Sequence, residues 1–282
     1  GEVASAWVTL QQMAARQSIA DEDRARSEAL LDLAKARREI GAAVRLDVVR
    51  AALQLQRDTL SQVMAQGDVL AAQVTLDVAL GVATDIRWQT PPPVPLPEPK
   101  EPQIDVRPDL IVLAAIWEAL GRSRQSERWS LAPTLSITGE GGALNRGEGW
   151  LPTTSVGATA RATPVSAVSL TRLKQLAAEQ EAARLRMDAA RQAAEGELAL
   201  AQETLRTAQV ALEVAASALV LADEELVLAQ DRFATGADGN LDLLAAQQRH
   251  GDVARDHVDS LARYNQSVVA VLWAGGSFAS LR

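Results

Sequence analysis

The sequence has 282 residues, of which 48% are hydrophobic and only 3% aromatic, and a formal net charge of −8. Alanine and leucine are abundant and are strong helix formers, so the composition favours an extended helical assembly over a compact α/β domain. The acidic balance provides no basic stripe for nucleic acid, and the absence of cysteine excludes disulfides, thiolate metal sites and a cysteine nucleophile.

Residues 1–88 predict a first hairpin of two long helices. Gly41 fits the end of the first helix, where a residue with positive φ is needed, and Leu46-Asp47 begins a second helix that runs to about Gly81. The pattern is already helical at Gly1, with no N-terminal cap, so we expect the natural chain to begin upstream of this residue. No uninterrupted apolar run approaches the ~20 residues of a membrane-spanning helix.

The middle of the chain predicts a connector, a helix and a strand pair. Residues 89–106 are rich in proline and form a stiff connector, and residues 107–131 form a helix that starts at Arg107-Pro108-Asp109-Leu110. Residues 132–166 alternate apolar and polar side chains around Leu135 and Val156, which is typical of two antiparallel strands. We expect the glycine-rich segment 139–149 to be the loop between them.

Residues 167–282 predict a second, complete hairpin. A helix extends from about Val168 to Thr235, which corresponds to roughly 100 Å at ~1.5 Å per residue. Between Leu198 and Phe233, leucine or phenylalanine recurs every seven residues with alanine between, which is typical of a tightly packed coiled-coil seam. A second apolar stripe consists of Leu200, Val214, Leu221 and Leu228. Two stripes indicate neighbours on two sides, as in the wall of a cylinder.

The two hairpins are copies of one pattern. The segments 33–51 and 228–246 align without a gap at an offset of 195 residues, which pairs Gly41 with Gly236 and Asp47 with Asp242. Each copy is therefore a long helix, a tight turn and a second long helix, and the first copy starts inside the helix.

These pieces resemble the TolC family of outer-membrane efflux and secretion ducts, in particular the branch that serves heavy-metal and drug efflux pumps. The resemblance is carried by Ala6-Trp7-Val8-Thr9-Leu10, both Gly-x4-Leu-Asp turns, Arg107-Pro108-Asp109-Leu110, Pro133-Thr134-Leu135-Ser136 and Tyr264-Asn265. It implies a mainly α fold with antiparallel coiled-coil hairpins of the α-barrel type and a two-stranded segment of a β-barrel shared by a homotrimer. It also implies an N-terminally truncated first repeat and a location in the bacterial outer membrane with a periplasmic extension.

The resemblance places the functional site at the hairpin turns, Gly41 and Gly236, which would form the periplasmic aperture. Asp242 and Asp47 are expected to narrow it, with Asp238 and Phe233 beside them; the alternative is that each Asp caps its own helix. Three copies of one carboxylate around an axis would attract cations. Asp238 stands where a basic residue can occur in the family and Phe233 where an aromatic hydroxyl is frequent, so the polar contacts of the family do not transfer whole.

No arrangement of residues predicts an enzyme, a metal site or a cofactor. His250 and His257 lie about 10 Å apart along one helix, too far to share a metal, and are interpreted as solvated surface residues. The leading hypothesis is a passive outer-membrane duct of a tripartite efflux pump or a type I secretion system, with a periplasmic adaptor and an inner-membrane transporter as partners. The alternative is a soluble periplasmic coiled-coil scaffold or adaptor that binds partners through its hairpins.

Overall fold

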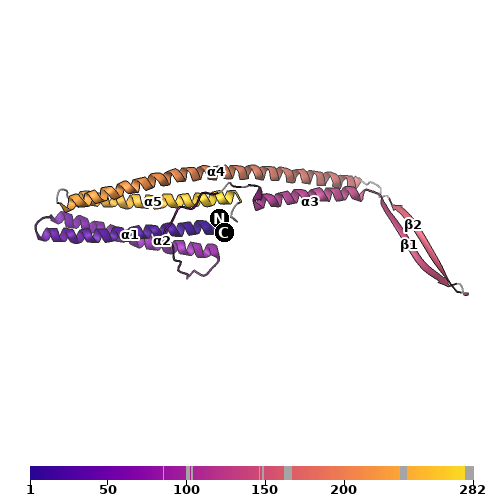
Figure 1. The fold of residues 1–282 in the computed structure, drawn as a ribbon, viewed down its shortest axis with the longest axis horizontal. Helices are drawn as coiled ribbons and strands as arrows, with labels where there is room; N and C mark the ends of the chain where they lie inside the picture. The colour runs from indigo at the N-terminus through magenta and orange to yellow at the C-terminus, as the bar shows by residue number, and fades with distance from the viewer. Residues whose placement is uncertain are drawn as a thin grey trace. The chain divides into compact units, whose positions relative to one another are not determined.

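The computed structural model describes residues 1–84, 86–99, 102, 104–145, 147, 149–161, 167–235 and 240–276. Their elements are α1 (Glu2–Glu39), α2 (Arg45–Leu80), a short 3-10 helix η1 (Ile104–Val106), α3 (Pro108–Ser130), β1 (Thr134–Asn145), β2 (Trp150–Arg161), α4 (Ala167–Ala234) and α5 (Asn240–Ala274). Contacts divide the chain into unit 1, residues 1–103 and 196–282, and unit 2, residues 104–195. Figure 1 shows the helices of unit 1 running side by side.

Unit 1 is a pair of helical hairpins, α1–α2 and the unit-1 part of α4 with α5. The first hairpin closes around Ala6, Leu10, Ala72 and Leu76, all of which are buried. The second hairpin closes along the heptad seam that the sequence predicts: Leu198, Leu226 and Phe233 are buried. Small residues at alternate seam positions let the helices approach closely, and α5 is buried along much of its length. The two hairpins then pack against each other through α1 and α5.

The proline-rich segment is a strap fixed to α5. Asn265, only 2% exposed, accepts a hydrogen bond from the Leu96 backbone N–H at 2.8 Å and donates one to the Val94 carbonyl at 3.0 Å. The Tyr264 hydroxyl donates to the Leu96 carbonyl at 3.0 Å. These bonds satisfy backbone groups that an extended proline-rich segment cannot pair internally.

Unit 2 holds α3, the first part of α4 and a long β-hairpin. β1 and β2 pair antiparallel from Thr134↔Arg161 to Asn145↔Trp150. The expected loop over residues 139–149 is therefore wrong: residues 139–145 belong to β1. Glycine lowers the strand propensity of this segment, but cross-strand pairing overrides that local preference. Ala162 and Thr163, which the sequence assigns to the second strand, lie outside the described residues.

Among the described residues, one helix, α2, is long and apolar enough to cross a membrane by length and composition, with a mean hydropathy of 1.2 over its most apolar window. The sequence shows no uninterrupted apolar run here, because polar residues divide the apolar positions of α2. Only 17% of that window is buried, so α2 presents a large apolar surface that the hairpin does not cover.

Replacing Asn265 with alanine is expected to destabilise unit 1 by about 1–3 kcal/mol, because the Leu96 N–H and the Val94 carbonyl both lose the buried side chain to which they are bonded. Urea unfolding followed by circular dichroism measures this change. The neighbouring substitution Gln266→Ala, at a position with no such bonds to the described part of the strap, should cost less than about 0.5 kcal/mol. Equal effects of the two substitutions would contradict the role of the strap.

Candidate functional site at the hairpin tips

The turn of the first hairpin is a helix-ending motif built on Gly41. Gly41 has φ +75°, which a residue with a side chain adopts only with strain. Its N–H donates to the Arg38 carbonyl at 3.1 Å, and the Ala42 N–H donates to the Arg37 carbonyl at 2.8 Å. This is the Schellman pattern, which satisfies the last carbonyls of α1. Gly236, its counterpart in the second hairpin, lies outside the described residues.

Asp47 lies in the first turn of α2, where its carboxylate accepts a hydrogen bond from the Val44 N–H at 3.2 Å. This is the capping geometry that the sequence left as an alternative to an aperture role, and the N-terminal end of the helix dipole favours the negative charge. The Asp47 carbonyl also accepts a hydrogen bond from the buried Asn240 side chain at 3.0 Å. The starts of α2 and α5 are thereby tied together.

Next to the turns, all four long helices of unit 1 contribute to one apolar core. Phe233, expected at the aperture, is 6% exposed and lies in this core, between the hairpins. The other buried members are Leu30, Leu31, Ala34, Ala51, Leu226, Leu243, Leu244 and Ala246. An aromatic side chain in this position contributes to the packing between the two hairpins.

Arg37 covers this core on the side that faces the turns. Its guanidinium lies 4.1 Å from the centroid of the Phe233 ring, a cation–π contact. It also donates to the Phe233 carbonyl at 2.8 Å, in the last turn of α4, where the helix dipole favours a cation. The sequence repeat matched Arg37 with Arg232 but gave no sign of this contact, because the partner lies 196 residues away.

Asp242 lies exposed in the first turn of α5, beside a groove between α4 and α5. The groove also holds Glu224, Glu225, Arg232 and Arg249. Arg249 binds Glu225 through both carboxylate oxygens, which lowers the pKa of Glu225, and the charge of Asp242 contributes to the raised pKa of Arg249. Asp242 is thus a solvent-facing carboxylate in a mixed-charge groove. Asp238 lies outside the described residues.

Further along the helices from the turns, a line of polar contacts joins α1 to α5. Arg16 binds Asp259 through both carboxylate oxygens, and Gln12 donates to the same carboxylate at 2.9 Å. Burial acts to raise the pKa of Asp259, but the hydrogen bonds and charge of Arg16 outweigh it, so this pKa lies below its ordinary value.

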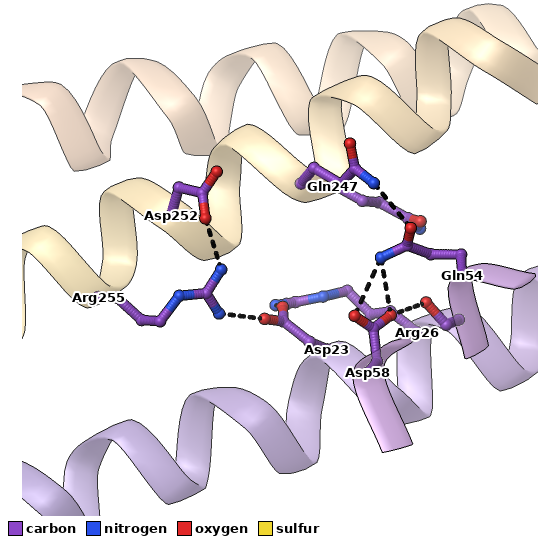
Figure 2. A pocket seen from close by; sticks show the side chains of 9 residues that line it. Asp23, Arg26, Gln54, Asp58, Gln247, Asp252 and Arg255 are labelled. Carbon is purple, nitrogen blue, oxygen red and sulfur yellow. Dashed lines mark hydrogen bonds and ion pairs between the residues drawn. The ribbon is translucent and has the colours of Figure 1, made fainter. Parts of the chain in front are cut away.

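Nearer the tips, Arg255 donates to Asp23 of α1 at 3.0 Å and to Asp252 of its own helix at 2.7 Å, as Figure 2 shows. Gly251 permits this approach: a Cβ added there would lie 2.7 Å from a carboxylate oxygen of Asp23. Arg255 and Gly251 are therefore a matched pair on α5, one binding Asp23 and the other making room for it.

The interpretation of His250 as a solvated surface residue is wrong. Its side chain is 12% exposed and contacts Asp223 of α4 and Arg26 of α1. The sequence could not reveal this, because both partners lie on other helices. Among the described residues, no cluster of His, Asp and Glu could hold a metal ion.

Neither a family model nor a curated protein matches the sequence. Solved structures do match the fold. A membrane protein from Pseudomonas aeruginosa superimposes with a TM-score of 0.71 at 21% identity, over 97% of this chain and 67% of its own. The outer-membrane channel OprN superimposes with a TM-score of 0.69 at 20% identity, over 98% of this chain and 65% of its own. CusC, a protein that forms a transmembrane channel, superimposes with a TM-score of 0.72 at 16% identity, over 96% of this chain and 66% of its own.

The chain thus has the TolC-like fold and spans about two thirds of the length of these proteins. At these identities the likeness establishes the architecture.

Replacing Arg37 with alanine is expected to loosen the tips, because it removes the contact with the Phe233 ring and carbonyl. A loss of ~1.4 kcal/mol would speed local hydrogen exchange about tenfold in residues 226–234 and 240–250. Arg37→Lys should give a smaller increase, since lysine keeps the charge but not the planar fork. Arg38→Ala, at the exposed neighbouring position, is the control; a similar increase in that variant would contradict the assignment.

Replacing Asp259 with asparagine is expected to cost about 1–3 kcal/mol of folding free energy at pH 7, because the carboxylate is hydrogen-bonded by Arg16. A carboxyl group with a lowered folded pKa adds stability above its unfolded pKa of ~3.9, and that stability is lost as the pH falls through the folded value. The difference between wild type and variant should therefore shrink below about pH 4. Denaturant unfolding across this range tests it, with exposed Asp256→Asn as control; a pH-independent difference would contradict the pairing.

Proposed function

We propose that this chain forms the wall of a passive outer-membrane duct for efflux, assembled as a homotrimer. A periplasmic adaptor and an inner-membrane transporter complete the pump and supply its energy. The observation that carries the proposal is the TolC-like fold combined with two long apolar stripes that a single copy leaves exposed.

The first stripe lies on α2. Its members recur at heptad spacing along the helix and are 46–61% exposed: Leu46, Val49, Leu53, Leu60, Val63, Leu70 and Val74. Charged residues such as Arg50, Arg57 and Asp68 flank the stripe. A membrane-spanning helix needs an apolar surface all round, whereas a stripe bordered by charges is the pattern of a helix–helix interface.

The second stripe lies on α4 and is formed by Leu200, Val214, Leu221 and Leu228, all 55–71% exposed. Because α1 and α5 pack in the middle of unit 1, α2 and α4 remain for contact with other copies. One copy's α2 can then meet the next copy's α4. Such a head-to-tail interface closes into a ring of three when each copy is rotated by a third of a turn without a rise along the axis, and three copies then make the cylinder wall.

The β-hairpin has the surface of a membrane-barrel segment. Leu135, Ile137, Val156 and Ala158 share one face, while threonine and serine dominate the other. Strands of 12 residues span ~40 Å, or ~30 Å of height at a tilt of ~40°, enough for the apolar band of an outer-membrane barrel. Exposed Trp129 precedes β1 and exposed Trp150 begins β2 at the far end, which are the positions of the two interfacial aromatic belts.

At the tips, Asp242 and Asp47 take different parts in this proposal. Asp242 is exposed and supplies one carboxylate per copy to a cation-attracting ring. Asp47, bonded to the Val44 N–H, holds the turn of the first hairpin. The same tips are the surface on which the adaptor packs.

The trimer is tested by placing two charges in the α2 stripe, Leu53→Glu with Leu60→Glu. Burying glutamates at each of the three interfaces, in place of leucines that contribute about 1.5–3 kcal/mol apiece, should dissociate the assembly. Light scattering in outer-membrane detergent should give a trimer for the wild type and a helical monomer for the variant.

The matched control is Ala29→Glu with Ala36→Glu, which has the same seven-residue spacing on an exposed face of α1. This control should remain trimeric. A monomeric wild type, or a trimer that tolerates glutamate at Leu53 and Leu60, would overturn the proposed assembly and favour a soluble scaffold that uses the stripe for another partner.

A further inference from the structure

His250 connects the two hairpins of unit 1 through opposite sides of one imidazole ring. Nε2 lies 2.8 Å from a carboxylate oxygen of Asp223 on α4, and Nδ1 lies 3.4 Å from a terminal guanidinium nitrogen of Arg26 on α1. Because His250 itself belongs to α5, its side chain links three helices. Its side chain is only 12% exposed.

The neutral ring satisfies both contacts at once. Arg26 can only donate and Asp223 can only accept, so the compatible tautomer carries its proton on Nε2 and accepts at Nδ1. Protonation adds an N–H at Nδ1. Two donors, each on a positively charged group, then face each other on the α1 side, while the contact with Asp223 becomes a full ion pair.

Arg26 has other hydrogen-bond acceptors near it when the His250 ring becomes charged. It already donates to Asp23 at 2.6 Å, and it lines a polar cavity of about 220 Å³ between α1, α2 and α5 (Figure 2). Asp58 of α2 and Gln247 of α5 line the same cavity. Arg26 Nε and Gln247 Oε1 have no hydrogen-bond partner among the described residues, so the cavity offers Arg26 unused acceptor capacity.

The other charged groups near His250 are already paired. On α5, Arg249 binds Glu225 of α4, and Arg255 binds Asp252 and Asp23. On α1, Glu22 lies 3.7 Å from Arg26. Asp223 is thus the anion that favours the charged ring, and Arg26 is the cation that opposes it.

We propose that His250 is an acid-sensitive latch between the hairpins: the neutral ring holds α1 to α5, and the protonated ring releases Arg26 and binds α4 alone. If the chain is the proposed duct, the latch lies just above the tips and loosens them as the surrounding compartment acidifies, so its role in gating rests on the proposed function. The latch itself is a property of one copy.

The experiment measures the distance between the hairpins as a function of pH. The chain has no cysteine, so Ala29→Cys on α1 and Ser217→Cys on α4, both exposed, place two spin labels without background. Pulsed electron paramagnetic resonance of labelled protein diluted into unlabelled protein then reports distances within one copy. From pH 7.5 to pH 5.0 we expect the distribution to broaden and move to longer distances.

Two substitutions separate the latch from a general acid effect. His250→Gln keeps an acceptor and a donor but does not titrate, so its distances should not change with pH. His257→Gln removes the only other histidine and should leave the acid response intact, since histidine is the side chain that changes charge between about pH 5 and 8. Circular dichroism verifies that both variants keep their helix content.

Asp223→Asn provides an independent check by shifting the response. Without the anion that favours the charged ring, the midpoint of the distance change should move to lower pH. An unchanged distance in the wild type, a response that survives His250→Gln, or a midpoint that stays fixed in Asp223→Asn would each overturn the latch. None of these results bears on whether the chain forms a trimer, so failure of the latch is distinguishable from failure of the duct.

Discussion

In unit 1, α2 and α4 each carry apolar side chains on two faces. Within one copy of the chain, only one face of each helix is covered. On α4, the face that includes Leu198, Leu226 and Phe233 is buried, while Leu200, Val214 and Leu221 are exposed. Roughly 25 cal/mol per Å² of apolar surface favours covering the second face. The stripes on α2 and α4 are therefore the surfaces of unit 1 that a further helix would cover.

Elements with a strong local period could be predicted from the sequence. The heptad from Leu198 to Phe233 specified both the helix and its buried face, and Gly41 marked a turn because few residues adopt its φ. The error over residues 139–145 came from reading glycines as a loop, although pairing with β2 holds them in a strand. Local propensity is a weak guide where the partner strand determines the conformation.

The contacts between the hairpins could not be predicted, because each joins residues far apart in the chain. Arg37 with the Phe233 ring, Asn240 with the Asp47 carbonyl and His250 with Asp223 each depend on how α1, α4 and α5 are placed. Together they make the tips a polar surface over an apolar core.

Electron cryomicroscopy of the detergent-solubilised assembly tests most directly whether the exposed stripes are covered by further copies of the chain. We expect a hollow cylinder of three copies in which Leu53 and Leu60 of one copy pack against the Leu221 and Leu228 face of α4 in the next. A solid bundle, or a particle in which the α2 stripe remains exposed to solvent, would contradict the proposed wall.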